Sequence, residues 1–243
     1  MHPTVALGLL STLLFGLRHG IDYDHIAAIT DITSTQRNRK EGAKLTLLYG
    51  AGHGAVIFAL GTLAVVFGAF LPASLDGIME RFVGATLIVL GVYVTWTLVR
   101  SPRGEFQMMG RYHLLLSLLT KFQNRKKSDV ATKSTSVYVP RSAFVIGMIH
   151  GIGAETPTQL GLFLFAAGVG GKLLGFAGVA LFVIGVLITN LLMGLLTART
   201  FESAASNSRR MLVYRGLAGI TACYSLVVGA IFLFGSSGIL PAL

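Results

Sequence analysis

The sequence predicts an all-α, polytopic membrane protein, and its composition and apolar segments carry that prediction. Hydrophobic residues make up 53% of the 243 residues, charged residues only 12%, and the mean hydropathy is +0.72. About 20 apolar residues span the core of a bilayer as a helix. Six transmembrane helices are therefore expected, over residues 4–30, 43–71, 81–99, 142–168, 173–198 and 212–235. The first segment lacks the basic start and the small-residue cleavage pattern of a secretory signal, so we expect it to be retained.

Basic residues predict the orientation of these helices. Three loops, 31–44, 100–141 and 199–215, hold 17 of the 20 Lys and Arg residues, and with six crossings all three lie on one side. The positive-inside rule makes that side cytoplasmic and puts both termini outside, in a multi-pass protein of the cell membrane. This topology accounts for the net charge of +10, so no nucleic-acid partner is expected beside the lipid bilayer.

The chain is organised around residues 17–31, where His19, Asp22, Asp24 and His25 stand in an apolar context. Each ionisable group costs on the order of 2.5–3.5 kcal/mol at mid-membrane, and a bound cation would offset that cost. Imidazole and carboxylate together are typical ligands of first-row divalent metals. In an unbroken helix of about 100° per residue, His19, Asp22 and His25 share one face, so we expect one helix to present this set.

Alternatives stay open for these residues. Arg18 lies four residues before Asp22, so Asp22 is either a ligand or an orienting partner, through a salt bridge to Arg18 or a hydrogen bond to a histidine. His19 and His25 are either ligands or core histidines hydrogen-bonded to neighbouring carboxylates.

Two later segments add candidate metal ligands. His53 is the one ionisable group of an apolar stretch flanked by small residues, which let helices approach closely and are expected to bring it against the first span. For His53 alone, packing and function are equally good interpretations. The fourth segment contributes His150, Glu155 and Gln159, and Asn190 in the fifth is expected to make an interhelical hydrogen bond.

An internal repeat predicts the architecture. Residues 15–24 align with 146–155 at an offset of 131, which matches His19 with His150 and Asp24 with Glu155. Each half holds three helices, so the second half enters the membrane in the opposite sense, as in many secondary transporters with interrupted helices. We expect interruptions at Gly20 and near Gly151, Gly153 and Pro157. The expected units are a first three-helix repeat (1–100), a cytoplasmic basic linker (101–141) and a second three-helix repeat (142–243).

At these residues the chain resembles the nickel/cobalt transporter family. Residues 19–26, His-Gly-Ile-Asp-Tyr-Asp-His-Ile, are similar to the family signature His-Ala-x-Asp-Ala-Asp-His-Ile. Residues 51–54 resemble its Leu-Gly-His-Ser motif, and residues 153–159 resemble its Gly-Phe-Asp-Thr-Ala-Thr-Glu motif, with Glu155 for Asp and Gln159 for Glu. The chain lacks the extra spans of the eight-span members and an Asp-rich motif in a later span.

The resemblance implies transport of a divalent transition-metal cation, nickel or cobalt, which is a transported ion and not a cofactor. With six expected spans and no ATP-binding motif, we expect a short secondary transporter. The expected metal ligands are His19, Asp22, Asp24, His25, His53, His150, Glu155 and Gln159. Import is favoured, because the negative interior attracts a divalent cation by about 4.6 kcal/mol per 100 mV. No P-loop and no His-Glu-x-x-His motif occurs, so neither an ATPase nor a metalloprotease is indicated. A metal exporter, a membrane haem or electron-transfer protein, a homo-oligomer and an unseen partner subunit stay open.

Overall fold

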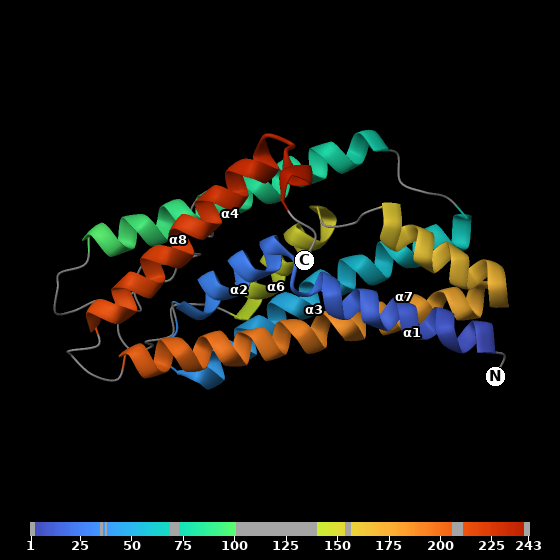
Figure 1. Ribbon diagram of the computed structural model, residues 1–243, viewed down its shortest axis with the longest axis horizontal. Helices are drawn as coiled ribbons and strands as arrows, with labels where there is room; N and C mark the ends of the chain where they lie inside the picture. The colour runs from blue at the N-terminus through green and yellow to red at the C-terminus, as the bar shows by residue number, and fades with distance from the viewer. Residues whose placement is uncertain are drawn as a thin grey trace, which may run out of the picture.

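The structure, a computed structural model, describes residues 3–34, 36, 38–68, 73–100, 140–153, 157–205 and 211–240, and all its regular elements in these ranges are helical (Figure 1). The predicted all-α class is confirmed. The α-helices are α1 (Pro3–His19), α2 (Tyr23–Ser34), α3 (Arg39–Phe67), α4 (Ala73–Arg100), α6 (Pro140–Gly153), α7 (Pro157–Ala205) and α8 (Met211–Leu233), and a short 3-10 helix (Ser237–Ile239) follows α8.

The first expected span is two helices, not one. α1 ends at His19, the chain turns through Gly20, and α2 begins where the amide of Ile26 donates to the carbonyl of Asp22 at 3.0 Å. The two helices are bent by 54°. The predicted interruption at Gly20 is present, and the expectation that one helix face presents His19, Asp22 and His25 is wrong, because the bend lies between the two histidines.

The fourth expected span is also divided. α6 ends at Gly153, and α7 begins at Pro157, a residue suited to the first position of a helix because its missing N–H has no partner there anyway. α7 breaks once more at Gly170 and at Gly171, which has a φ of 78° that favours glycine. Residues 142–168 therefore comprise α6 and the first part of α7.

α2 lies at the centre of the helical packing. α1 packs along α7, α3 packs against both α7 and α6, and α4 packs against α8, while α2 contacts α3, α4, α7 and α8. Ile29 and Ile32 of α2 are fully buried beside Leu45 of α3. A second apolar cluster between α3 and α7 contains Phe163 and Phe182. The polar stretch of the sequence is thus enclosed by other helices.

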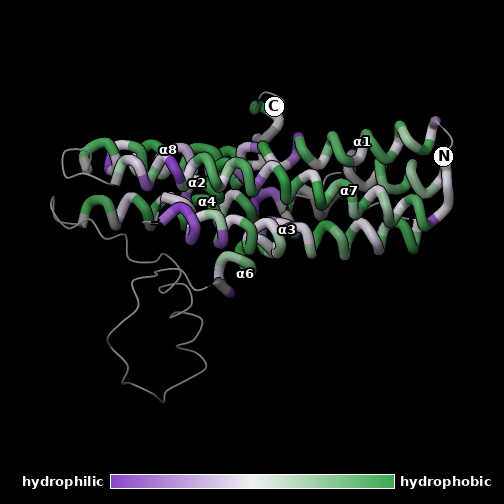
Figure 2. Tube along the Cα trace, turned by 90° about the horizontal axis from the view of Figure 1, so that it is seen from below, coloured by the Kyte–Doolittle hydropathy of each residue, from purple (hydrophilic) through white to green (hydrophobic). Residues whose placement is uncertain are grey.

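The outer face of the helices is apolar, as a lipid environment requires. Large hydrophobic side chains are exposed on several helices, among them Leu7, Phe67, Leu196 and Leu212. In the described residues three helices are long and apolar enough to cross a membrane, Arg39–Phe67, Gly170–Ala204 and Leu212–Leu233, and the bent pair α1–α2 makes a fourth. Figure 2 shows hydrophilic residues near the middle of the molecule, between apolar stretches. A multi-pass membrane protein is supported, while six crossings stay a prediction.

Candidate metal centre

Three histidines from three helices meet inside the protein. His19 ends α1, His25 lies in the first turn of α2, and His53 lies in the middle of α3. Their relative exposures are 4%, 0% and 0%. One ligand atom from each lies within 4.8 Å of the other two, and the Nε2 atoms of His19 and His53 are 3.4 Å apart. Two nitrogens bound to one tetrahedral ion at the zinc–nitrogen distance of about 2.0–2.1 Å would be separated by about 3.4 Å, so this pair has the spacing of a tetrahedral site.

Partners at the outer nitrogens orient two of these rings. Nδ1 of His19 lies 2.8 Å from Oδ2 of Asp22, and Nδ1 of His25 lies 3.0 Å from Oδ1 of Asn190. Because both oxygens can only accept, each Nδ1 is the N–H donor and each Nε2 keeps its lone pair. Nε2 of His25 has no hydrogen-bond partner among the described residues. Such outer partners are typical of metal-binding histidines.

The break after α1 creates this arrangement. The hydroxyl of Thr189 in α7 donates to the carbonyl of Leu17 at 2.9 Å and so satisfies one of the carbonyls at the end of α1. Gly20 lies against Thr189, and a Cβ at Gly20 would lie only 2.8 Å from the Cβ of that residue. The end of α1 thus points at the histidines, where the negative end of the helix dipole favours a cation.

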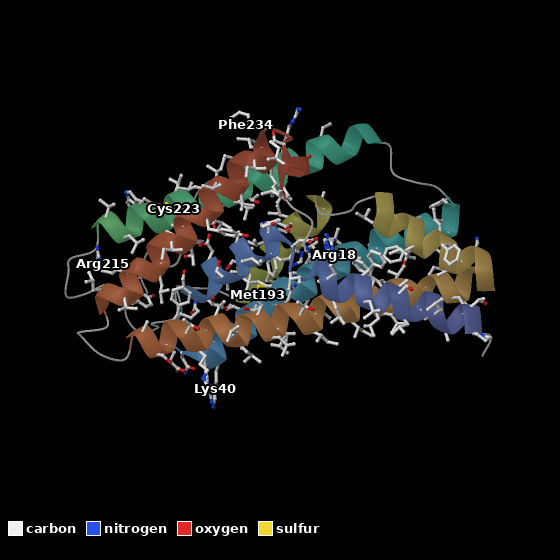
Figure 3. All side chains as sticks on the ribbon, viewed as in Figure 1. Arg18, Lys40, Met193, Arg215, Cys223 and Phe234 are labelled. Carbon is white, nitrogen blue, oxygen red and sulfur yellow. The ribbon has the colours of Figure 1, made fainter. Side chains whose placement is uncertain are left out.

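The two aspartates of the signature differ in their surroundings. Asp22 lies between the ring of His19 and the guanidinium of Arg18, whose Nη1 is 3.7 Å from Oδ1. Its geometry fits the orienting role that the sequence left open. Asp24 is only 4% exposed and lies within electrostatic range of His19, His25 and His150. Arg18 itself lies near the middle of the molecule (Figure 3).

The second half contributes less to this cluster. His150 of α6 is fully buried, but it is outside the three-histidine group and instead contacts the ring of Tyr49, with a centroid distance of 5.7 Å. Glu155 lies outside the described residues, and so does the side chain of Gln159. Their predicted roles as ligands are therefore not tested.

The small residues that flank His53 pack against helices other than the expected first span. A Cβ at Gly52 would collide with the backbone carbonyl of Phe144 in α6, and a Cβ at Gly54 would lie 2.8 Å from Val183 in α7. The close helix approach at these glycines is thus to α6 and α7, and not to the first span. His53 of α3 still lies beside His19 at the end of α1, with their Nε2 atoms 3.4 Å apart.

Two polar residues outside the predicted ligand set are important here. The interhelical hydrogen bond expected for Asn190 is confirmed, and its partner is His25. Asp31, which sequence reasoning did not select, is fully buried in α2, and the hydroxyl of Ser225 in α8 donates to it at 3.1 Å. Asp31 follows Asp24 by seven residues, about two helical turns, so helical periodicity places both on one face and could have identified it.

Known relatives of the chain have names that refer to nickel or cobalt. The nickel transporter NixA of Staphylococcus aureus is 24% identical over 96% of this chain and 73% of its own length. The hydrogenase nickel incorporation protein HupN of Bradyrhizobium diazoefficiens is 25% identical over 97% of this chain and 66% of its own length. The cobalt transport protein NhlF of Rhodococcus rhodochrous is 26% identical over 99% of this chain and 74% of its own length. The resemblance to nickel/cobalt transporters is thereby confirmed over nearly the whole chain. No family model and no solved structure matches the chain.

Proposed function

We propose that this chain is a secondary transporter that imports a divalent transition-metal cation, nickel or cobalt, through a site formed by His19, His25 and His53. The observation that carries the proposal is the convergence of three buried imidazoles, two of them oriented through their Nδ1 atoms by Asp22 and Asn190. Imidazole ligands favour nickel, cobalt, copper or zinc over magnesium or calcium. Among these four metals we favour nickel and cobalt, because the relatives are named for them.

The proposal includes six crossings in two inverted repeats, 1–100 and 142–243, joined by a cytoplasmic linker, 101–141. Equivalent close contacts between helices in the two halves support the repeats. A Cβ at Gly16 would collide with the carbonyl of Phe182, and a Cβ at Gly147 would collide with the carbonyl of Tyr49. Gly16 and Gly147 are 131 residues apart, which is the offset of the internal repeat. Interrupted helices in both halves agree with the same arrangement.

The orientation and direction of transport belong to the same proposal. Lys40 and Arg215 lie toward the same end of the molecule in Figure 3, the end that the positive-inside rule makes cytoplasmic. Both termini are then outside, and the membrane potential favours import. Glu155 and Gln159 are proposed as weaker contacts of the second half along the path.

A haem or electron-transfer role is the competing function. Buried histidines are also axial haem ligands, but the three ligand atoms here lie within 4.8 Å of one another, close enough for one ion to be bound by all three. An absorbance spectrum of the purified protein separates the two functions, because a haem protein shows an intense Soret band. We expect no such band.

Uptake in proteoliposomes tests the proposal. Vesicles that contain the full chain should accumulate Ni²⁺ or Co²⁺ when their interior is negative, and an exporter would instead require the reverse gradient. The variant His25→Ala should abolish uptake while the protein stays in the membrane. His113→Ala, in the proposed cytoplasmic linker 101–141, should not abolish it. Equal uptake by His25→Ala and the unmodified chain would refute the assignment.

A further inference from the structure

A second group of buried polar side chains lies beside the three histidines. It consists of His150 of α6, Tyr49 of α3 and Asp24 of α2, whose relative exposures are 0%, 0% and 4%. His150 lies outside the stretches that resemble the transporter signatures. These side chains come from three helices that pack around the centre of the molecule.

The polar atoms of this group are poorly satisfied by the protein. In the described part of the chain, the hydroxyl of Tyr49 lacks a hydrogen-bond partner, and the ring of His150 has only a weak interaction with the backbone of Ile146 that falls short of a well-formed hydrogen bond. Leaving a buried polar group unpaired costs about 1–3 kcal/mol. Two buried polar rings 5.7 Å apart with so few hydrogen bonds need an explanation, and an ordered water or a bound ion would supply the missing partners.

Tyr49 connects this group to the three-histidine site. The centroid of its ring is 6.0 Å from that of His25, 6.2 Å from that of His53 and 5.7 Å from that of His150. Asp24 lies within electrostatic range of both His25 and His150. The two groups of side chains are therefore neighbours, with the ring of Tyr49 between them and the carboxylate of Asp24 near both.

We propose that His150, Tyr49 and Asp24 form a second, weaker position for the same divalent cation, next to the three-histidine site. The identity of the cation rests on the proposed function. One imidazole with a phenol and a carboxylate offers fewer nitrogen ligands than three imidazoles, so first-row transition metals bind it less tightly. Conduction requires sites that are weak or multiple enough for the ion to leave, and a neighbouring weak position meets that need.

The alternative is that His150 only fills space between α6 and α3. Gly147 and Gly151 of α6 already lie against the backbone of α3, so the helices approach closely without any contribution from the ring of His150. A space-filling role predicts that phenylalanine can replace His150 with no change in metal stoichiometry.

Titration of the purified full chain in lipid nanodiscs with Co²⁺, followed by equilibrium dialysis and visible absorption, separates the two roles. The unmodified chain should bind two equivalents, the second at least tenfold more weakly than the first. His150→Phe should keep the first equivalent and lose the second. Tyr49→Phe, which removes a single oxygen, should weaken the second equivalent several-fold and leave the first unchanged.

Further variants control for misfolding. If His150→Phe has a lowered melting temperature, His150→Gln keeps a polar side chain and should still lose the second equivalent. A single tight equivalent in the unmodified chain, or a second equivalent that persists in both His150 variants, overturns the second position alone. Absence of the tight equivalent, or its survival in His25→Ala, overturns the proposed function and this position with it.

Discussion

Two helix crossings, α1 on α7 and α6 on α3, are alike in their backbones and different in their chemistry. In each crossing, a glycine of one helix lies against a backbone carbonyl of the other. Gly16 lies against the carbonyl of Phe182, and Gly147 lies against the carbonyl of Tyr49. In each, a histidine follows the glycine by three residues, His19 in α1 and His150 in α6.

The surroundings of the two histidines differ. Nδ1 of His19 bonds to Asp22 and its Nε2 lies 3.4 Å from that of His53, whereas in the described residues the ring of His150 has only a weak interaction with the backbone of Ile146. The repeated backbone geometry thus does not determine the ligand set. In our account, the α1 crossing supplies tight binding, and the α6 crossing supplies the weaker position from which the ion leaves.

The largest expected effect is the loss of a ligand at the tight site. His53→Ala removes an imidazole whose Nε2 is 3.4 Å from that of His19. Because changes to outer partners of a metal site already cost about 10–100-fold in affinity, we expect a loss of more than about 100-fold, measured by calorimetry with Ni²⁺. His113→Ala is the matched control. An unchanged affinity in His53→Ala would remove α3 from the site.

The backbone equivalence is tested by adding one methyl group to each crossing. Gly16→Ala and Gly147→Ala should each destabilise the protein by about 1–3 kcal/mol, the usual cost of overpacking, because the new Cβ would collide with a carbonyl. Gly8→Ala and Gly216→Ala are controls, since nothing lies within 4 Å of a Cβ there. Denaturation in mild detergent measures all four variants. A tolerated Gly147→Ala beside a damaging Gly16→Ala would show that the crossings are not equivalent.

Variants of Asp22, which orients the ring of His19 in our account, should lose less Ni²⁺ affinity than His53→Ala. Asp22→Ala removes the acceptor 2.8 Å from Nδ1 of His19, so Ni²⁺ affinity should fall by about 10–100-fold. Asp22→Asn keeps an oxygen that can accept from Nδ1 and should restore most of the affinity. If Asp22→Asn is as weak as Asp22→Ala, the carboxylate acts as a charge or a direct ligand.

The smallest effect is expected at the end of α1. Thr189→Val keeps the shape of the side chain and removes the hydrogen bond to the carbonyl of Leu17. The net contribution of such a bond is about 0.5–1.5 kcal/mol, so thermal unfolding should shift slightly and metal affinity should change by less than tenfold. Thr200→Val is the control, because in the described part of the chain its hydroxyl bonds to the carbonyl of Leu196 in its own helix. A shift no larger than the control's would argue against this cap.

The sequence predicted the helical class, the interruption at Gly20 and the residues of the three-histidine cluster, because composition, glycine and charge in an apolar context are local signals. It did not predict how those histidines meet. Their separation on one regular helix suggested a single face, while the 54° bend instead brings His25 against His19 from a different helix.

Long-range partners were the other part that local signals could not supply. Asn190 was expected to bond to another helix, but its partner, 165 residues away, depends on how α7 packs against α2. Likewise, the small residues near His53 indicated close packing without showing that α6 and α7 are the neighbours. Such pairings arise from the tertiary arrangement of several helices.

X-ray absorption spectroscopy of the nickel-loaded full chain tests most directly whether His19, His25 and His53 hold the ion. Our account predicts nitrogen neighbours at about 2.0–2.1 Å with the multiple scattering of three imidazoles, at one equivalent of Ni²⁺. His53→Ala should lower the imidazole number by one, and His150→Phe should leave it unchanged. A shell of oxygen atoms without imidazole scattering in the unmodified chain would contradict the account.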